Sequence, residues 1–148
     1  MSEQAVKPYI RSPFYHETDK MGIIHHSNYI RWLEEARIDF MDQIGFGYKR
    51  TEDEGIMIPV LSVSCRYHSM VRFGDTVAIY MAITELTGAR MTIVYRILDA
   101  ASGELRTTGE SSHCFLGASG RPVSAKKALP EMYRLFEANK SGTLALLD

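Results

Sequence analysis

The hydrophobic pattern of this chain changes its period near residue 57, and this change limits the possible folds. Before it, apolar residues recur at helical spacing at Tyr29, Leu33, Ala36, Phe40 and Ile44, which puts them on one face of a helix. After it, apolar and polar residues alternate, as expected for strands with one buried face. A long helix and several such strands bury their apolar surfaces by packing together, so we expect an α+β fold.

The predicted helix is apolar on more than half of its surface, because Ile30, Trp32 and Met41 widen the apolar face. A helix of this kind must be covered by other structure. Ser27 is a suitable N-cap residue and Gly45 a suitable stop signal. We therefore expect a helix that starts at Ser27, ends before Gly45 and is wrapped by the sheet.

Four runs with a period of two follow, and each predicts a strand. They cover Leu61–Tyr67, Val77–Ile83, Met91–Ile97 and Leu105–Leu116. Turn signals separate them at residues 73–75, 87–88 and 101–103. Because these connections are short, the pattern predicts that consecutive strands are antiparallel neighbours.

The two ends of the chain complete one predicted domain over residues 1–148. Residues 6–15 can form a first strand, and Pro8 and Pro13 favour an edge position for it. A short final helix is expected with Pro130 in its first turn. A sheet of this size around one helix leaves open edges, so we expect at least a homodimer.

Composition excludes several classes of protein. The net charge of −1 lacks the basic excess of a nucleic-acid-binding protein. No apolar run is long enough for a membrane span, and the N-terminal segment has no signal-peptide core. Cys65 and Cys114 are isolated and fit two reduced thiols. We therefore expect a cytoplasmic protein with no membrane span and no nucleic-acid partner.

Polar residues are concentrated in the segment YHETDKMGIIHHSNY, residues 15–29, directly before the helix. A helix N-terminus offers unpaired N–H groups and partial positive charge, so it can stabilise an oxyanion. His26 and Ser27 lie at this terminus, and Gly22 permits a sharp bend or a close ligand. Asp19 could then fold back and attack a carbonyl or deprotonate water.

Two other interpretations of this segment stay open at this point. It could be an ordinary solvated loop, since Asp and Glu are usually surface residues. It could also bind a metal through His16, Glu17, Asp19, His25 and His26. Adjacent histidines diverge, however, and no spacing puts two imidazoles on one helix face. We therefore predict no metal site and no cofactor.

The same segment resembles a family signature, in which Tyr15, Glu17-Thr-Asp19, Gly22, His26 and Asn28-Tyr29 are the matching positions. The match continues through Trp32-Leu-Glu-Glu-Ala-Arg37, Arg72-Phe-Gly-Asp75 and Gly120-Arg-Pro122. Over roughly residues 9–137 the chain is similar to the 4-hydroxybenzoyl-CoA thioesterase family of hotdog-fold acyl-CoA thioesterases. His25 stands where relatives often carry an aromatic residue.

The resemblance implies a fold, an activity and a division of roles. The hotdog fold wraps one helix in a sheet of about five antiparallel strands. In such proteins the residue matching Asp19 is the nucleophile or general base, and the N–H matching His26 polarises the thioester carbonyl. The His26 side chain is also implicated in catalysis. The resemblance further implies an acyl-CoA substrate and an active site at the interface of a homodimer or homotetramer.

Further residues are candidates for substrate binding. Tyr15, Gly22, Ser27 and Tyr29 flank the expected site, and the two tyrosines could line an acyl pocket or belong to the core. Basic residues should bind the coenzyme A phosphates, and the candidates are Arg90, Arg121, Lys126 and Lys127.

Three other residues, His68, His113 and Glu35, have interpretations other than substrate binding. We expect His68 and His113 to be structural residues of the strands. Glu35 is a surface ion-pair candidate four residues after Arg31 and an alternative base on the helix.

Three rival functions remain open from the sequence. They are a hydratase or dehydratase of the same fold, a non-catalytic binder of acyl-CoA or acyl carrier protein, and a metal-dependent hydrolase. The sequence does not define the acyl group, or whether the thioester is carried by coenzyme A or by a carrier protein.

Overall fold

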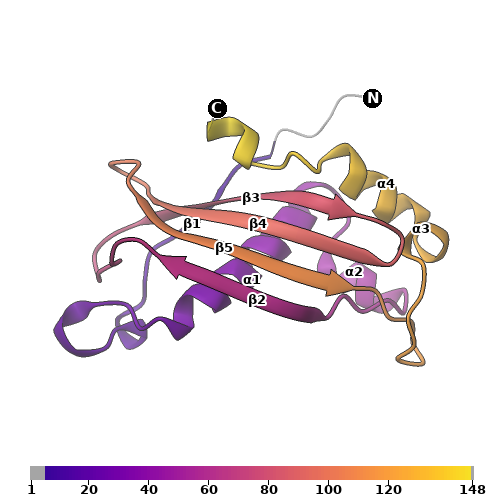
Figure 1. Ribbon diagram of the computed structural model, residues 1–148, viewed down its shortest axis with the longest axis horizontal. Helices are drawn as coiled ribbons and strands as arrows, with labels where there is room; N and C mark the ends of the chain where they lie inside the picture. Colours follow the sequence, from indigo (N-terminus) through magenta and orange to yellow (C-terminus); the bar gives the residue numbers. More distant parts are fainter. Residues whose placement is uncertain (1–5, 148) are drawn as a thin grey trace.

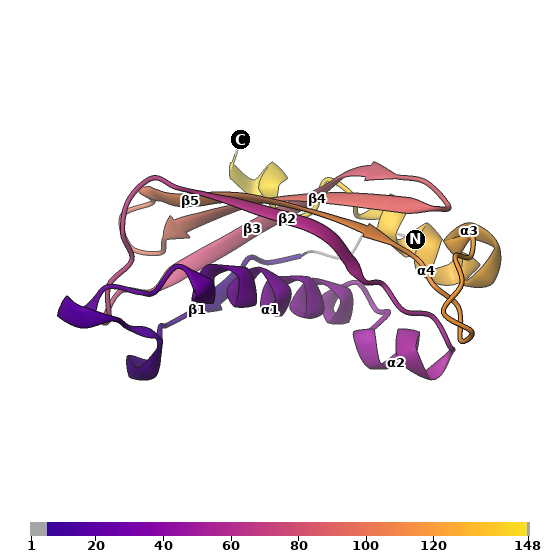
Figure 2. The ribbon, with the colours of Figure 1, turned by 60° about the horizontal axis from the view of Figure 1, so that its bottom comes forward.

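A long helix, α1 (Ser27–Gln43), lies across one face of a five-stranded antiparallel sheet (Figures 1 and 2). The computed structural model describes residues 6–147. The strands are β1 (Tyr9–Arg11), β2 (Val60–Tyr67), β3 (Val77–Leu86), β4 (Arg90–Asp99) and β5 (Leu105–Cys114). Short helices complete the fold: η1 (Tyr15–Glu17), η2 (Lys20–Gly22), α2 (Tyr48–Asp53), α3 (Ala125–Ala128), α4 (Pro130–Ala138) and η3 (Leu144–Leu147). The predicted α+β hotdog arrangement is thus confirmed.

The strand order is β1-β3-β4-β5-β2, which corrects one predicted neighbour pair. The strands β3, β4 and β5 are joined by tight turns and pair in sequence, as expected. The strand β2 does not pair with β3 but with β5, through partners such as Val63 with Ser111. Residues 68–76 form a connection long enough to cross the end of the sheet, so they do not act as a hairpin turn.

The first strand is shorter than predicted. Only Tyr9–Arg11 pairs with β3, although the sequence favoured residues 6–15. Pro8 and Pro13 lie just outside the paired residues, and a proline cannot donate a hydrogen bond to the neighbouring strand. The predicted edge position of this strand is confirmed.

The apolar face of α1 forms the core with the sheet, as the periodicity predicted. Trp32 and Leu33 are fully buried. The helix can approach β5 closely because Gly109 has no side chain, and a Cβ there would meet Leu33 Cδ1 at 3.0 Å. Gly45 ends the helix with a φ of 94°, as expected for a stop signal.

The prediction that Ser27 caps α1 is wrong. Ser27 is the first helical residue, and His26 occupies the cap position without a side-chain cap hydrogen bond. The sequence also missed α2 and α3, because six- and four-residue helices are too short to show a period. The helix α4 has Pro130 in its first turn, as predicted.

Cys65 and Cys114 carry free thiols. None of the helices formed by the described residues is long and apolar enough to cross a membrane.

Candidate functional site

A surface pocket at the N-terminal end of α1 brings together Asp19 and His26. It lies at the end of the molecule where the loop before α1 projects (left in Figure 1). Its lining comes from the loop, the first turn of α1 and residues 67–72 and 106. The lining residues are Asp19, Ile23, Ile24, His26, Tyr29, Tyr67, His68, Ser69, Met70, Arg72 and Arg106. The predicted pair of a carboxylate and a helix N-terminus is therefore present in one pocket.

Backbone hydrogen bonds fold the loop back onto the start of the helix. The Asp19 N–H donates to the Ile23 carbonyl at 2.8 Å, and Thr18 forms a β-bridge with Ile24. The His25 N–H donates to the Glu17 carbonyl at 3.0 Å. These contacts make residues 17–25 a closed loop, with Asp19 at its turn.

The turn after Asp19 uses an unusual backbone conformation. Met21 and Gly22 both have a positive φ, of 73° and 72°. A Cβ on Gly22 would meet no atom within 4 Å, so the glycine serves the bend rather than a close approach. The Gly22 carbonyl accepts the Phe73 N–H at 2.9 Å, which ties the turn to the segment before β3.

His26, at the N-cap of α1, lines this pocket. Among residues 6–147 we find no acceptor for the His26 N–H. The next N–H, of Ser27, donates to His25 Nδ1 at 3.2 Å, and Ser27 Oγ lies 2.9 Å from the same nitrogen. The His25 ring therefore satisfies the helix end and stacks on His26 at 4.3 Å between ring centroids. His26 keeps its amide and ring available to a ligand.

Two tyrosines form the floor beside His26. Tyr67 donates its hydroxyl to the His26 carbonyl at 3.4 Å, and its ring lies 5.0 Å from that of Tyr29. The Tyr29 hydroxyl accepts the Val71 N–H at 3.3 Å. Burial raises the pKa of both phenols, so they stay protonated. Tyr29 thus belongs to the core and to the pocket at once.

A buried ion pair supports the loop, and no sequence pattern predicted it. Arg11 binds the Glu17 carboxylate through two hydrogen bonds, at 2.9 and 2.8 Å. Glu17 also accepts Trp32 Nε1–H at 3.1 Å and the Phe14 N–H at 2.7 Å. Burial alone raises the pKa of Glu17, but these hydrogen bonds outweigh burial and lower it. The Glu17 carboxylate is therefore charged and holds the loop in place through these hydrogen bonds.

Glu35 is held in the same ion-pair cluster. It accepts hydrogen bonds from Arg11 Nε at 2.8 Å and from the Tyr9 hydroxyl at 3.0 Å. The expected ion pair with Arg31 is not formed among the described residues, because Arg11 takes this position. Glu35 does not line the Asp19 pocket.

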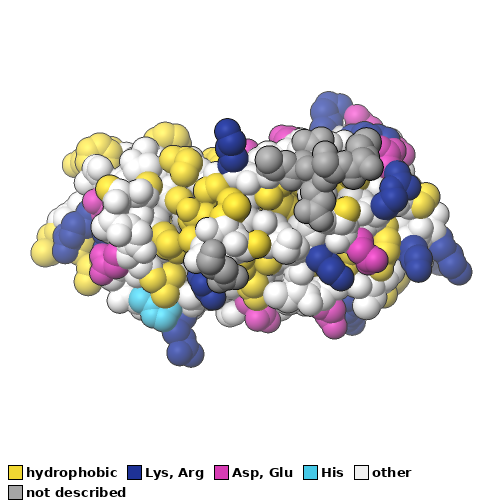
Figure 3. Space-filling model, turned by 90° about the horizontal axis from the view of Figure 1, so that it is seen from above, with side chains coloured by type: hydrophobic (Ala, Val, Ile, Leu, Met, Phe, Trp, Pro, Cys, Tyr) yellow, Lys and Arg dark blue, Asp and Glu magenta, His cyan; other side chains and the backbone are white. Residues whose placement is uncertain are grey.

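Other predicted site residues lie outside this pocket. Tyr15 is 74% exposed and packs against Phe73, at 5.5 Å between the rings. Hydrophobic side chains gather on this end of the molecule (left in Figure 3). Arg90 begins β4 opposite Cys114, at the other end of the sheet from Asp19 (Figure 1). Arg121, Lys126 and Lys127 do not line the pocket either.

Three basic residues in the pocket were not selected from the sequence for ligand binding. His68, Arg72 and Arg106 line the pocket with Asp19. Arg106 is bound to Asp99 at 3.0 Å, whereas Arg72 is exposed and forms no ion pair with a described residue. Arg72 lies in the segment Arg72–Asp75, which matches the family signature. This match was the sequence signal that could have identified Arg72 as a site residue. Within residues 6–147 no group of three or more potential metal ligands is found.

Comparisons with known proteins identify the family of this chain. The family model described as "Thioesterase-like superfamily" matches residues 15–135. A Bacillus subtilis protein named "Putative acyl-CoA thioesterase YneP" is 33% identical over 127 residues, which are 85% of this chain and 91% of that protein.

Two solved structures are similar over most of the chain. The DHNA-CoA thioesterase of Staphylococcus aureus is 28% identical, with 88% of each chain covered and a TM-score of 0.83. The hypothetical protein TT1821 of Thermus thermophilus is 30% identical, with 88% of this chain and 97% of that chain covered and a TM-score of 0.81. From the family match and these relatives, the chain belongs to the thioesterase-like superfamily and has the hotdog fold.

Proposed function

We propose that this protein is an acyl-CoA thioesterase that hydrolyses its substrate to a free carboxylic acid and coenzyme A. Asp19 acts as nucleophile or general base, and the His26 N–H stabilises the oxyanion. One observation carries this proposal: Asp19 lines the same pocket as His26, whose amide has no acceptor among the described residues. The family match and the name of the Bacillus subtilis relative support the same reaction class.

The general-base route needs only these two groups. Asp19 takes a proton from water as the water oxygen bonds to the thioester carbon. The carbonyl oxygen becomes an oxyanion that accepts the His26 N–H at the positive end of α1. The C–S bond then breaks, and the coenzyme A thiolate takes the proton back from Asp19. Removing one oxyanion donor typically costs ~2.7–4 kcal/mol.

The nucleophilic route uses the same positions in a different order. An Asp19 carboxylate oxygen attacks the carbonyl carbon, the thiolate leaves, and a mixed anhydride forms. Water then hydrolyses the anhydride and restores Asp19. The His26 ring, stacked on His25, can hydrogen bond to the leaving sulfur or to the incoming water. The geometry supports both routes.

The pocket rim offers a partner for the phosphate groups of coenzyme A. Arg72 is exposed beside Asp19 and His26 and has no competing carboxylate among the described residues. A free guanidinium can bind phosphate through two hydrogen bonds. We therefore assign phosphate binding first to Arg72. Arg90 keeps this role only if a second subunit places it near the site.

We infer that a second copy of the chain pairs along β2. This strand ends the sheet, so one of its sides has no neighbour. Its apolar side chains stay open to solvent, with Val60 44%, Leu61 49% and Tyr67 46% exposed. An unpaired apolar edge is a site for strand pairing. Antiparallel pairing about the middle of β2 brings the Val60 end of one copy next to the Asp19 pocket of the other.

The substitution Asp19→Asn tests the proposed reaction. It keeps the side-chain shape and removes the charged base, so thiol release from acyl-CoA should fall by at least about a hundredfold. Release is followed with a thiol dye across a panel of acyl-CoA substrates, and folding by circular dichroism. The matched control is Asp53→Asn, at an exposed position on α2. A variant that still turns over at the wild-type rate would refute these roles.

The same assay separates the rival functions. A hydratase would change the acyl chain and release no thiol, and a binder would leave the thioester intact for hours. A metal-dependent hydrolase would lose activity after dialysis against a chelator, whereas the proposed enzyme keeps it. Presenting the same acyl group on coenzyme A and on an acyl carrier protein identifies the physiological carrier.

A further inference from the structure

The connection between β2 and β3, residues 68–76, lies against the loop that carries Asp19 (left in Figure 1). Backbone contacts join the two segments: the Ile24 N–H to the Val71 carbonyl at 2.9 Å, the Phe73 N–H to the Gly22 carbonyl at 2.9 Å, and an isolated β-bridge between Ile23 and Arg72. Residues 22–24 and 71–73 therefore pair in the manner of two short strands. The position of the loop depends on where the connection lies.

The pairing reaches Asp19 through one further hydrogen bond. The Asp19 N–H donates to the Ile23 carbonyl at 2.8 Å, and Ile23 is bridged to Arg72. The main chain of Asp19 is thus two contacts away from the connection. A shift of residues 71–73 would therefore move the Asp19 carboxylate relative to His26.

Arg106, at the start of β5, holds the connection near both of its ends. Its carbonyl accepts the N–H groups of His68 at 2.8 Å and Ser69 at 3.1 Å. Its Nη1 donates to Ser69 Oγ at 3.2 Å, and its Nη2 lies 3.8 Å from Asp75 Oδ2. One guanidinium therefore spans the residues where the connection leaves β2 and approaches β3.

Asp99 fixes this guanidinium in place. Arg106 Nη2 donates to Asp99 Oδ2 at 3.0 Å, and Asp99 Oδ1 accepts the N–H groups of Ala101 and Ser102 at 2.9 Å each. The Ser102 N–H, Arg106 and the Ala101 N–H lower the pKa of Asp99 to about 2. Asp99 is therefore ionised at neutral pH and ties the Arg106 side chain to the turn between β4 and β5.

The donors of Arg106 are committed to the protein. Nη1 faces Ser69 and Glu104, at 3.2 and 3.1 Å, and Nη2 faces Asp99 and Asp75. Nε is buried and has no partner among the described residues. Arg106 lines the pocket, but its five N–H groups are occupied or enclosed. It therefore acts on the pocket through the connection and not by contact with a substrate phosphate.

The same guanidinium balances three carboxylates. Asp75, Asp99 and Glu104 lie 3.8, 3.0 and 3.1 Å from its nitrogens. The Arg106 side chain is 16% exposed, and charges that are partly buried are screened less than exposed ones. Loss of the guanidinium leaves the carboxylates to repel each other. Asp75 also accepts the Arg72 N–H at 2.9 Å, so its displacement would disturb residues 71–73 directly.

We propose that Arg106 is a positioning residue that keeps the Asp19 carboxylate aligned with the His26 N–H. It holds residues 68–76 against the loop and does not itself contact the substrate. The inference rests on the proposed thioesterase function. A misplacement of about 1 Å can lower turnover roughly 100-fold, so loss of Arg106 should lower kcat and leave KM nearly unchanged.

Amide hydrogen exchange, followed by nitrogen-15 NMR, measures this positioning directly. The Ile24 and Phe73 amides, here called the reporter amides, should exchange at least about tenfold faster in Arg106→Gln than in the wild type, because local opening exposes them. The reference is the Met57 amide, bonded to the Leu116 carbonyl at 2.8 Å away from the pocket. Unchanged exchange of the reporter amides would overturn the inference. A uniform increase that includes Met57 would overturn it too, because that result indicates only a loss of global stability.

Kinetics separate positioning from phosphate binding. In Arg106→Gln, kcat for acyl-CoA hydrolysis should fall at least about tenfold. KM should stay the same for acyl-CoA and for acyl-pantetheine, which has no phosphates. The control is Arg96→Gln, at an exposed position on the neighbouring strand β4 that does not line the pocket, and its kcat should equal that of the wild type. A higher KM for acyl-CoA alone, with unchanged kcat in Arg106→Gln, would overturn the inference.

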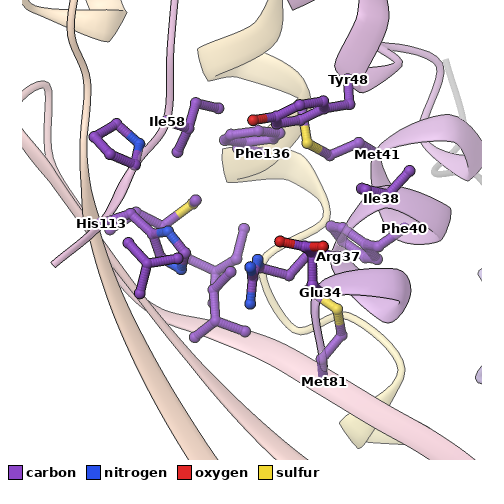
Figure 4. A pocket seen from close by; sticks show the side chains of 15 residues that line it. Glu34, Arg37, Ile38, Phe40, Met41, Tyr48, Ile58, Met81, His113 and Phe136 are labelled. Carbon is purple, nitrogen blue, oxygen red and sulfur yellow. The ribbon is translucent and has the colours of Figure 1, made fainter. Parts of the chain in front are cut away.

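Arg37→Gln controls for the loss of a partly buried arginine. Arg37 lies on α1 and lines a separate cavity of about 350 Å³ between this helix and the sheet (Figure 4). The cavity shares no lining residue with the Asp19 pocket, and Arg37 donates to the Tyr95 hydroxyl at 3.1 Å. The reporter amides should therefore exchange at the wild-type rate. Faster exchange in this variant would overturn the inference, because the loss of any such arginine would then have the same effect.

Ser69→Ala decides the question if Arg106→Gln does not fold. It removes the hydrogen bond to Nη1 and leaves every charge in place, so reporter exchange should rise and kcat should fall by about fivefold. Unchanged exchange in folded Ser69→Ala would overturn the inference. The exchange measurements do not depend on turnover. Absence of acyl-CoA hydrolysis by the wild type would refute the proposed function, whereas the reporter amides still show whether Arg106 holds the loop.

Discussion

Arg11 and Glu17 are joined by two parallel hydrogen bonds, from Nη1 to Oε1 at 2.9 Å and from Nη2 to Oε2 at 2.8 Å. Both side chains are buried. Because Glu17 also accepts a hydrogen bond from Trp32 on α1, the pair connects β1, the loop and the helix. Asp19 follows two residues later, so the geometry of the loop that carries Asp19 depends on this ion pair.

Replacement of Glu17 by Gln should therefore damage both stability and activity. Removing one partner of a buried ion pair typically costs about 3–5 kcal/mol, and Glu35 should keep the cost at the lower end because it still binds Arg11. A loop displaced by about 1 Å can lower turnover by roughly 100-fold. Urea unfolding measures the first effect, and kcat for acyl-CoA hydrolysis measures the second.

The matched control breaks an exposed ion pair. Glu131→Gln removes the partner of Arg50, which lies 2.8 Å away on the surface. Solvated pairs contribute little, so neither the unfolding midpoint nor kcat should change measurably. If Glu17→Gln behaves like this control, the ion pair does not position the loop.

Gly22→Ala should impair catalysis more than stability. A residue with a side chain at φ of 72° is strained by about 1–2 kcal/mol, although no atom blocks the new methyl group. The loop can relieve this strain by changing the turn that follows Asp19. We expect a small loss in the free energy of unfolding and a roughly tenfold or larger loss in kcat.

Gly120→Ala provides the comparison for this prediction. Gly120 has a φ of 80° and an equally open environment, but it lies away from the Asp19 pocket. The substitution should cause a similar loss of stability with unchanged kcat. Equal kcat values for the two variants would show that the bend at Gly22 is not needed for turnover.

Most of the fold could be predicted from the sequence, because the period of the apolar residues shows which face of a helix or strand is buried. The face of α1 that carries Trp32 and Leu33 is buried as predicted, and the tight turns correctly predicted the pairing of β3, β4 and β5. The position of β2 was not predictable in this way. Its pairing with β5 is decided by which free edge the strand reaches after a nine-residue connection, and that choice depends on tertiary packing.

The site was predictable where it depends on local sequence. Asp19 and His26 are close in the chain and meet in one pocket, and Gly22 makes the expected bend. The Arg11–Glu17 ion pair was missed although its members are only six residues apart, because two charged residues in a loop follow no periodic pattern that predicts their contact. His113 was expected to be a structural strand residue, and it is buried in β5.

The stability of the protein should fall as the pH decreases from about 6.5 to 4. Burial lowers the pKa of His113 to about 4, whereas an unfolded histidine has a pKa of ~6.5. In this range the unfolded chain binds a proton that the folded chain does not, so unfolding becomes more favourable. The loss should be roughly 3 kcal/mol at ~1.36 kcal/mol per pKa unit, and urea unfolding at several pH values measures it.

His113→Phe should remove this dependence. The variant lacks the titrating group, so its stability should change less between pH 6.5 and 4, whatever its absolute value. Below about pH 4 both proteins should lose stability. The pKa of Glu17 is lowered in the folded protein, so the unfolded chain takes up a proton at Glu17 that the folded chain does not bind. An unchanged slope in the variant would mean that another group titrates.

Arg72→Gln should weaken binding of the coenzyme A portion of the substrate. Arg72 is the exposed guanidinium of the Asp19 pocket without an ion-pair partner among residues 6–147. We expect KM for acyl-CoA to rise about tenfold, equivalent to ~1.4 kcal/mol, with unchanged kcat. KM for the matching acyl-pantetheine, which has no phosphates, should not change.

Arg134→Gln on α4 is the matched control, since it is an exposed arginine at the other end of the molecule. It should leave both KM values unchanged. Arg90→Gln in the same assay tests the expectation from the sequence for that residue. An equal rise in KM for acyl-CoA and acyl-pantetheine in Arg72→Gln would show that Arg72 does not bind phosphate.

Leu61→Lys should block the proposed pairing of two copies along β2. Leu61 is 49% exposed and lies in the irregular step between Val60 and Ser62, so a lysine there should cost the single chain little. Lysine on an edge strand opposes strand pairing because its charge would be buried between the copies. Analytical ultracentrifugation should show a smaller assembly than the wild type, and thiol release should fall with it.

Ile10→Lys tests whether the effect belongs to β2. Ile10 is 55% exposed on β1, which forms the opposite edge of the same sheet, so the substitution adds the same charge to an edge without a proposed partner. It should change neither the sedimentation coefficient nor the activity. A monomeric Leu61→Lys protein with full activity would separate catalysis from assembly, because Asp19 and His26 would then act without a second copy.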